Sequence, residues 1–125
     1  MDITSDVKQD SVSIKIKAQE NGKVLGWVYL YVLKNGRHDE PFGLVENLYV
    51  NPETRGQGVG TKLVEAVITE AKRQGCYKLI GTSRNSRPEL QKFYTRFGFE
   101  VWGVEYRMNL IESKINNAEA CEIKS

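Results

Sequence analysis

A glycine-rich segment holds the residues with the clearest chemical meaning in this sequence. Its residues are Arg55-Gly56-Gln57-Gly58-Val59-Gly60-Thr61. Three alternate glycines let a backbone approach a bound group closely and present consecutive N–H donors to it. A helix is predicted to begin here, and its N-terminus adds a partial positive charge. The segment therefore predicts an anion site whose natural occupant is a pyrophosphate.

Two common phosphate-binding patterns do not fit this segment. A P-loop requires Gly-Lys-Ser/Thr after four variable residues, whereas here Lys62 follows Thr61. The dinucleotide fingerprint requires a third glycine where Thr61 stands, within a doubly wound parallel sheet. A purely structural explanation also stays open, in which the glycines only connect a strand to a helix.

Alternating apolar residues before the segment predict an antiparallel meander of three strands. The first strand starts at Val12, and Asn21-Gly22 suits the positive φ angles of a tight hairpin turn. The β-branched and aromatic residues 24–33 form the return strand, and residues 43–50 form the third. Asn51-Pro52 ends the meander, because proline cannot donate to a strand ladder.

The apolar period then changes to that of a helix. The apolar positions are Leu63, Val64, Val67, Ile68 and Ala71, with Gly75 placed to end the helix. Residues 77–81 read as a short strand. A strand–helix–strand run of this kind predicts a parallel pair joined by a right-handed crossover.

A second helix is predicted to open at Ser86-Arg87-Pro88-Glu89, where Ser86 and Glu89 can form a capping box. Its apolar stripe is Leu90, Phe93, Tyr94 and Phe97, and Gly98 closes it. Residues 101–110 return as one strand, or as two strands broken at Gly103.

Composition narrows the class of protein. The chain has 125 residues and a net charge of +2, so bulk electrostatics does not favour direct nucleic-acid binding. Cys76, Cys121 and the single His38 are too few for a disulfide framework or a usual metal site. No apolar run approaches the length of a membrane span, and the polar start is unlike a signal peptide. We expect a cytoplasmic protein with a lead-in (1–11), one domain (12–111) and a polar tail (112–125).

Two motifs together resemble a known family. Arg55-x-x-Gly58-x-Gly60 is similar to the Gln/Arg-x-x-Gly-x-Gly/Ala acetyl-CoA signature of the GCN5-related N-acetyltransferase (GNAT) superfamily. A second hallmark, a Phe-Tyr pair followed by Gly-Phe, matches Phe93-Tyr94-Thr95-Arg96-Phe97-Gly98-Phe99. The resemblance covers roughly residues 12–110. It implies an α/β fold with a mixed, mostly antiparallel, twisted sheet of about six strands and two main helices.

The resemblance also implies where acetyl-CoA binds. In the family two central strands splay apart, and the pantetheine arm enters between them like a further strand. Here these strands are residues 44–50 and 77–81, and the Leu48 amide faces the thioester oxygen, a contact worth about 3 kcal/mol of barrier. The implied cofactor-binding residues are Leu48, Tyr49, Val50, Arg55, Gly56, Gln57, Gly58, Val59, Gly60, Thr61, Asn85 and Tyr94. No metal is implied.

Two side chains are candidates for moving protons. Glu46 is a carboxylate in an otherwise apolar strand, where several relatives place a working glutamate. It is the candidate base, with acceptor binding or a plain strand-edge role as alternatives. Tyr94 aligns with the tyrosine that many relatives aim at the CoA sulfur, so it is the candidate acid; a packed core ring is the alternative. Asn85 fits a cofactor contact only loosely, and a turn role suits it equally.

The expected function is acetyl transfer from acetyl-CoA to a primary amine, on a small molecule or a protein, by direct attack in a ternary complex. Relatives usually carry a strand and two helices before the meander, whereas here about eleven polar residues precede Val12. These elements wall the acceptor site in the relatives, so three alternatives stay open here. A second subunit supplies the wall, a macromolecular acceptor fits the open groove, or the protein binds acyl-CoA without turnover. We expect a homodimer, because the exposed apolar surface otherwise faces water.

Overall fold

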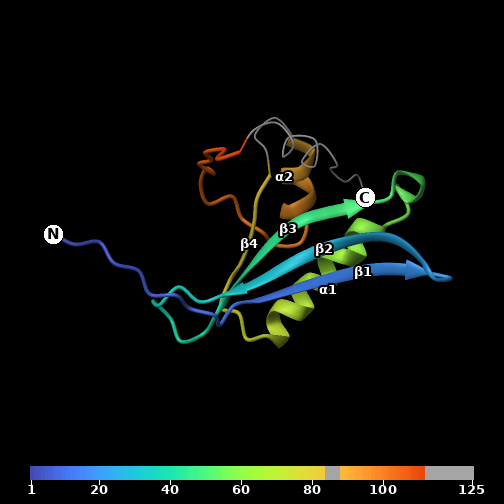
Figure 1. Cartoon of the computed structure of the whole chain (residues 1–125). Helices are drawn as coiled ribbons and strands as arrows, with labels where there is room; N and C mark the ends of the chain where they lie inside the picture. The colour runs from blue at the N-terminus through green and yellow to red at the C-terminus, as the bar shows by residue number, and fades with distance from the viewer. Residues whose placement is uncertain (84–87, 112–125) are drawn as a thin grey trace.

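The computed structural model describes residues 1–83 and 88–111. Four strands form one sheet in the order β1-β2-β3-β4, and two helices pack with it (Figure 1). The β1–β2 and β2–β3 pairs are antiparallel and the β3–β4 pair is parallel. The elements are β1 (Val12–Glu20), β2 (Lys23–Leu33), β3 (Phe42–Val50), the 3₁₀ turn η1 (Pro52–Thr54), α1 (Val59–Arg73), β4 (Leu79–Gly81) and α2 (Pro88–Thr95).

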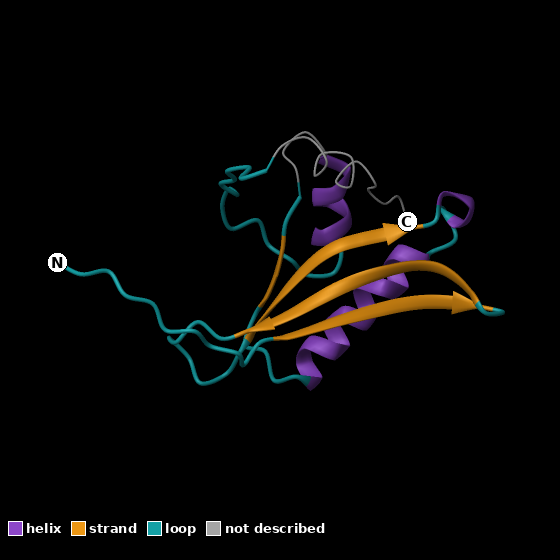
Figure 2. Cartoon of the chain, in the orientation of Figure 1, coloured by secondary structure: helices purple, strands orange, loops and turns teal. Residues whose placement is uncertain are grey.

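The antiparallel meander is confirmed, with its first turn where the sequence predicted it. Asn21 has a φ of 52° and Gly22 a φ of 78°, the left-handed backbone that a two-residue hairpin requires. Residues 1–11 precede β1 and lie in neither a helix nor a strand (Figure 2).

The core lies between α1 and one face of the sheet. Alternate residues of β2 turn toward α1 and are buried, whereas the residues between them are half-buried on the other face. Gly26 lets the helix come close: a Cβ there would lie 2.5 Å from the Tyr49 carbonyl oxygen and 3.2 Å from Leu63 Cδ1. The largest fully buried side chains are Leu30, Val28, Val50, Val64 and Val67.

Gly75 ends α1 as the sequence predicted. It has a φ of 79°, and its N–H donates to the Lys72 carbonyl oxygen at 3.0 Å. The next N–H, that of Cys76, donates to the Ala71 carbonyl oxygen at 3.0 Å. These two bonds form a Schellman motif, which satisfies carbonyl groups that the helix leaves without partners.

The second helix is shorter than its apolar stripe. Leu90 and Phe93 are buried in the same core, and the Phe93 ring meets the Phe97 ring edge-on at 5.3 Å between centroids. Phe97 lies just beyond the end of α2, in the turn that Gly98 closes with a φ of 97°. The capping role predicted for Ser86 falls outside the described residues.

The prediction of about six strands is wrong, because the described residues form four. Residues 101–110 alternate like a strand, yet none of them lies in one. A cavity of about 950 Å³ separates them from β4: Leu79 to Ser83 line one part of it and Phe99 to Glu105 another. Without an adjacent edge the segment gains no ladder hydrogen bonds, and Trp102 and Tyr106 are each 91% exposed.

The close approach at Gly26 gives a prediction for stability. Gly26→Ala places a methyl group against the Tyr49 carbonyl and Leu63, so we expect the free energy of unfolding to fall by about 1 to 3 kcal/mol. Gly103→Ala is the matched control, because its Cβ would meet nothing within 4 Å. Urea unfolding of both variants measures the difference. Equal stability of the two variants would contradict the packing described here.

Candidate active site

The parallel pairing of β3 with β4 stops halfway along β3. The paired residues are Gly43 with Leu79, Leu44 with Ile80, and Val45 with Gly81. Residues 46–50 of β3 continue beyond this point with no β4 partner, and we call them the open edge of β3. Backbone N–H and C=O groups on such an edge can pair with an extended ligand as they would with a strand. This matches the separation of the two strands that the family resemblance implied.

A β-bulge begins the open edge. Opposite the single residue Val28, β3 places both Asn47 and Leu48, and Asn47 has a φ of 55°. The extra residue shifts the alternation of the strand, so Leu48 and Val50 are buried on the α1 side. Asn47 is not among the site residues expected from the sequence. The break in apolar alternation at Glu46-Asn47 was the available signal.

Hydrogen bonds hold the turn that follows β3. The Asn51 side chain accepts from the Glu53 N–H at 3.1 Å, and the Thr54 hydroxyl donates to the Asn51 carbonyl at 3.0 Å. Arg55 Nε donates to the Val50 carbonyl oxygen at 3.3 Å. The turn is therefore tied to the end of β3 and brings the glycine-rich segment next to the open edge.

The glycine-rich segment has the conformation of an anion-binding loop. Gly56 and Gly58 have φ angles of 87° and 81°, and a Cβ on either would meet nothing within 4 Å. Gly58 is the N-cap of α1 and offers no side-chain cap. The first α1 amide that finds a carbonyl is that of Lys62, at 3.1 Å from the Gly58 oxygen. The amides of residues 59–61 have no partner within the described part of the chain, and so fit a pyrophosphate.

Tyr94 lies on the helix side of the sheet. Its Cε1 atom is 3.8 Å from the position of a Cβ on Gly81, and its ring meets those of Phe93 and Phe99 edge-on. Gly81 is the last residue of β4 and the partner of Val45. Tyr94 is half-buried, so its ring packs in the core beside the point where the two strands stop pairing.

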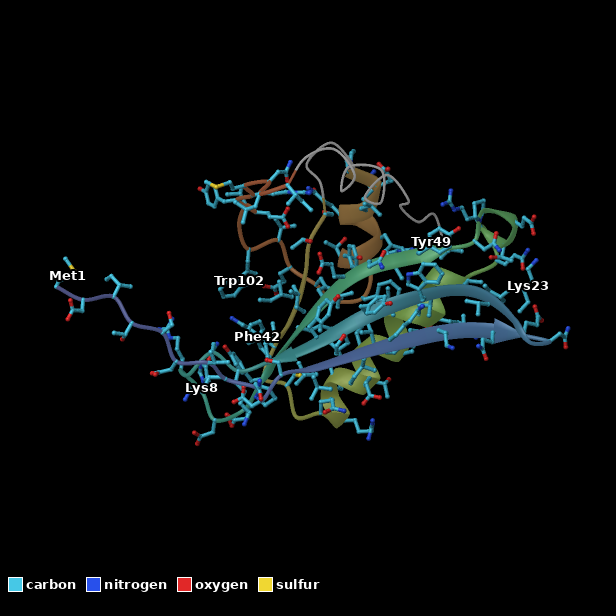
Figure 3. The ribbon with its side chains drawn as sticks, viewed as in Figure 1. Met1, Lys8, Lys23, Phe42, Tyr49 and Trp102 are labelled. Carbon is cyan, nitrogen blue, oxygen red and sulfur yellow. The ribbon has the colours of Figure 1, made fainter. Side chains whose placement is uncertain are left out.

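On the opposite face of the sheet, the side chains of Trp27, Tyr29, Tyr31 and Tyr49 lie together, and we call this surface the aromatic face. The Trp27 and Tyr49 rings stack with centroids 4.5 Å apart. Glu46 lies on this face, because it is paired directly with Tyr29. Neither α1 nor α2 packs on it in the described structure, and Figure 3 shows Tyr49 on β3.

The charge of Glu46 affects a neighbouring tyrosine on the aromatic face. Burial, the Glu46 carboxylate and Tyr29 together raise the pKa of the Tyr31 hydroxyl. A tyrosine hydroxyl is protonated at neutral pH in any case, and this shift acts in the same direction, so Tyr31 keeps an O–H donor on this face. Glu46 itself is exposed. Glu46 and Tyr94 thus flank the strand separation from opposite faces of the sheet.

The structure therefore brings most of the expected site residues together. Leu48, Tyr49 and Val50 lie on the open edge of β3, and residues 55–61 follow directly after the turn. Asn85 lies outside the described residues. The roles of Glu46 and Tyr94 remain predictions, although their positions suit them.

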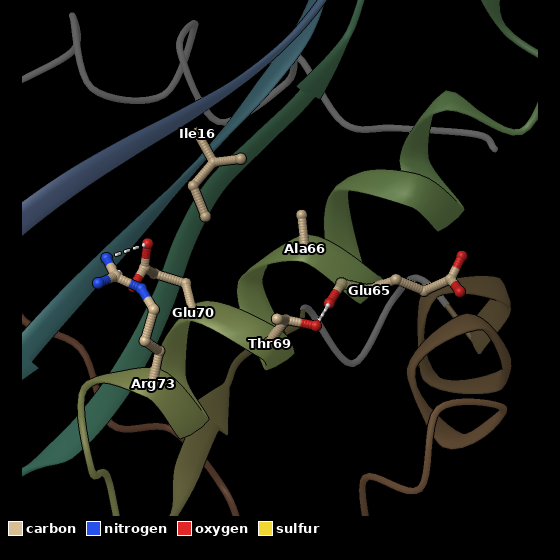
Figure 4. Close-up of a pocket in the computed structure, with 6 residues that line it drawn as sticks. All are labelled: Ile16, Glu65, Ala66, Thr69, Glu70 and Arg73. Carbon is tan, nitrogen blue, oxygen red and sulfur yellow. Dashed lines mark hydrogen bonds and ion pairs between the residues drawn. The ribbon is translucent and has the colours of Figure 1, made fainter.

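A second, shallower recess of about 360 Å³ lies between β1 and the outer surface of α1 (Figure 4). Ile16 and Ala66 contribute its apolar surface. Arg73 forms an ion pair with Glu70 at 2.6 Å, which lowers the pKa of Glu70 through the hydrogen bond from Arg73. Its α1 residues lie between 65 and 73, beyond the first turn of the helix, and none of them is among the expected site residues.

Other chemistries find little support among the described residues. Burial raises the pKa of the Cys76 thiol, which keeps it protonated and weakly nucleophilic. No group of three or more His, Cys, Asp or Glu side chains there is arranged to hold a metal ion. Neither described helix has the length and apolar character needed to cross a membrane.

Comparisons with known proteins agree with this geometry. A sequence model of the Acetyltransferase (GNAT) family matches residues 3–99. The chain is 38% identical over 63 residues to "Probable glucosamine 6-phosphate N-acetyltransferase 2" of Oryza sativa subsp. japonica, covering 50% of this chain and 36% of the relative. It is 31% identical over 94 residues to the glucosamine 6-phosphate N-acetyltransferase of Trypanosoma brucei brucei, covering 74% of this chain and 61% of the relative.

A solved structure shares the fold. The Trypanosoma brucei acetyltransferase Tb11.01.2886 superposes with a TM-score of 0.66 at 28% identity, covering 80% of this chain and 69% of that one. The chain thus spans between about a third and two thirds of the length of the curated relatives described above. With the family model matching most of its length and a glycine-rich helix start set beside an open strand edge, the chain belongs to the Acetyltransferase (GNAT) family.

Proposed function

We propose that this protein transfers an acetyl group from acetyl-CoA to a primary amine. The observation that carries the proposal is the early end of β3–β4 pairing beside an α1 N-terminus without a side-chain cap. An extended pantetheine arm can pair with the open edge of β3, and a pyrophosphate can accept hydrogen bonds from the amides of residues 59–61. Acetyl-CoA therefore supplies hydrogen-bond partners both for the open edge of β3 and for the amides at the start of α1.

In the proposed reaction the amine attacks the thioester carbonyl directly. The C–N bond forms, the C–S bond breaks, the amine loses a proton and the CoA thiolate gains one. The amide of Leu48, on the open edge, is the proposed donor to the oxygen that becomes negative during attack. Glu46 accepts the amine proton, directly or through water, and the Tyr94 hydroxyl protonates the thiolate. Their placement on opposite faces of the sheet separates the two proton transfers.

The aromatic face also supports a second candidate function. Because no described helix covers it, the same chain can bind acyl-CoA as a module without turnover, or form an acceptor site only with a partner. We also propose that it is a homodimer, since the apolar side chains of residues 101–111 are exposed. A cytoplasmic location fits the free Cys76.

The test combines calorimetry with CoA release. We expect acetyl-CoA to bind, and CoA to appear when an amine is added from a panel of glucosamine 6-phosphate, an aminoglycoside, spermidine and a lysine peptide. Binding without release from any of them selects the non-catalytic module. Absence of binding overturns both candidate functions.

Gly58 tests the cofactor loop separately. Gly58→Ala adds a methyl group at the start of α1, where a phosphate would lie, so we expect acetyl-CoA affinity to fall at least ~10-fold. Gly22→Ala is the matched control, because its φ of 78° and open surroundings resemble those of Gly58. Both variants carry similar backbone strain, but only the first should lose affinity. An equal loss in both would remove the loop from the site.

Tyr94 tests the acid role. Tyr94→Phe keeps the packed ring and removes the hydroxyl, so we expect turnover to fall at least ~10-fold while acetyl-CoA affinity stays the same. Tyr106→Phe, which alters a 91% exposed ring, is the control. Steady-state kinetics and calorimetry give the two quantities. Unchanged turnover of Tyr94→Phe would leave Tyr94 as a packing residue.

A further inference from the structure

The aromatic face carries an ordered arrangement of charge that the proposed reaction does not explain. The register aligns three residues in one row across the strands: Lys15 on β1, Tyr29 on β2 and Glu46 on β3. Directly paired residues of antiparallel strands point to the same face. The row therefore runs from a cation, over an aromatic ring, to a carboxylate next to the strand separation.

A second row lies beside the first and repeats part of its chemistry. It consists of Lys17 on β1, Trp27 on β2 and Tyr49 on β3, and the last two rings are stacked. Both lysines are exposed, and both lie on the strand farthest from β4. With strands spaced about 4.8 Å apart, the lysine end and the Glu46 end are separated by about 10 Å. Tyr29 and Trp27 lie between these ends, Tyr49 lies on β3 with Glu46, and we call these three rings the platform.

The positive charge also reaches the platform itself. Lys15 Nζ lies 4.6 Å from the centroid of the Trp27 ring and 5.7 Å from that of Tyr29, in cation–π contact with both. A second cation on the platform would be repelled by this ammonium, whereas an anion would pair with it. The Nε1 of Trp27 is buried and has no hydrogen-bond partner in the described structure, so the exposed part of the Trp27 ring, and not its N–H, is what the platform offers to a ligand.

We propose that the acceptor is a primary amine that carries an acidic group, either carboxylate or phosphate, on the far side of a ring or similar apolar body. This inference rests on the proposed acetyl transfer and names its substrate class. The amine lies at Glu46, next to the open edge of β3. The ring of the acceptor takes the place of the Lys15 ammonium over Tyr29 and Trp27, beside Tyr49. The acidic group draws Lys15 toward Lys17 and pairs with both.

The arrangement also excludes acceptors. A polycationic amine such as spermidine would place a second ammonium near Lys15 and Lys17, with no carboxylate of the two rows to receive it. Like charges at this distance disfavour binding, and the cost decreases as salt rises. The two rows therefore select for a zwitterionic acceptor and against a dicationic one of the same size.

Binding can be measured without acetyl transfer. The chain has two tryptophans, so Trp102→Phe leaves Trp27 as the only indole, and Trp102 is 91% exposed. Fluorescence of Trp27 in this background then reports ligands on the platform, with and without CoA. The probes are 4-(aminomethyl)benzoate and 4-(aminomethyl)phenylphosphonate, compared with benzylamine and the dication 4-(aminomethyl)benzylamine.

We expect both acidic probes to bind at least ~10-fold more tightly than benzylamine, and the dication more weakly still. Lys15→Gln combined with Lys17→Gln should remove this preference. Lys34→Gln changes the same charge on an exposed residue outside the two rows and should keep it. The carboxylate and phosphonate probes distinguish the two acidic groups by their relative affinity.

Two outcomes would overturn the inference: equal binding of the dication and the acidic probes, or no change in Trp27 fluorescence with any probe. Neither outcome bears on acetyl transfer, which the CoA-release assay tests separately. Conversely, a protein that releases no CoA with any amine can still bind the acidic probes more tightly than benzylamine and the dication. The failures of the two proposals are therefore distinguishable.

Discussion

The early end of the parallel β3–β4 ladder is the constraint on which the rest of this structure depends. Three residue pairs join the two strands, and β3 then continues to Val50 paired with β2 but not with β4. A strand edge is stable only if its polar backbone groups find partners. Here that need falls beside the start of α1, where amides also lack partners in the described structure. The backbone groups on the open edge of β3 and the amides of residues 59–61 therefore lie next to each other. A long ligand with an amide arm and a pyrophosphate can form hydrogen bonds with both.

The packing of α1 against the sheet places these two sets of backbone groups side by side. Gly26 removes a side chain from the sheet where Leu63 arrives, so the first turns of the helix lie directly against β2 and β3. The bulge at Asn47 then restores burial, because it returns Leu48 and Val50 to the helix side. If the same residues continued from Val45 in regular alternation, with Asn47 in the ladder, both side chains would turn outward. The site is therefore built on rigid elements that the core holds in place.

The sheet also separates two chemical environments. On the helix side, Tyr94 packs among Phe93 and Phe99 in an apolar setting. On the other side, the aromatic face combines stacked rings with lysines at one end and Glu46 at the other. A thioester at the strand separation would meet the first environment at its sulfur and the second at its incoming amine. The pairing register, rather than any single residue, determines that Glu46 lies on the aromatic face.

The sequence by itself determined the meander, both helices, the hairpin turn and the glycine-rich loop before α1, because each follows from local periodicity and from glycine positions such as Gly22, Gly58 and Gly75. It also indicated Glu46 by its place in an apolar strand. It did not predict the bulge at Asn47, and it wrongly made residues 101–110 a strand, because pairing depends on an edge supplied elsewhere in the chain. Only the tertiary structure aligned Lys15 with Glu46 across three strands. Register is fixed by long-range packing and bulges, which local sequence pattern does not encode.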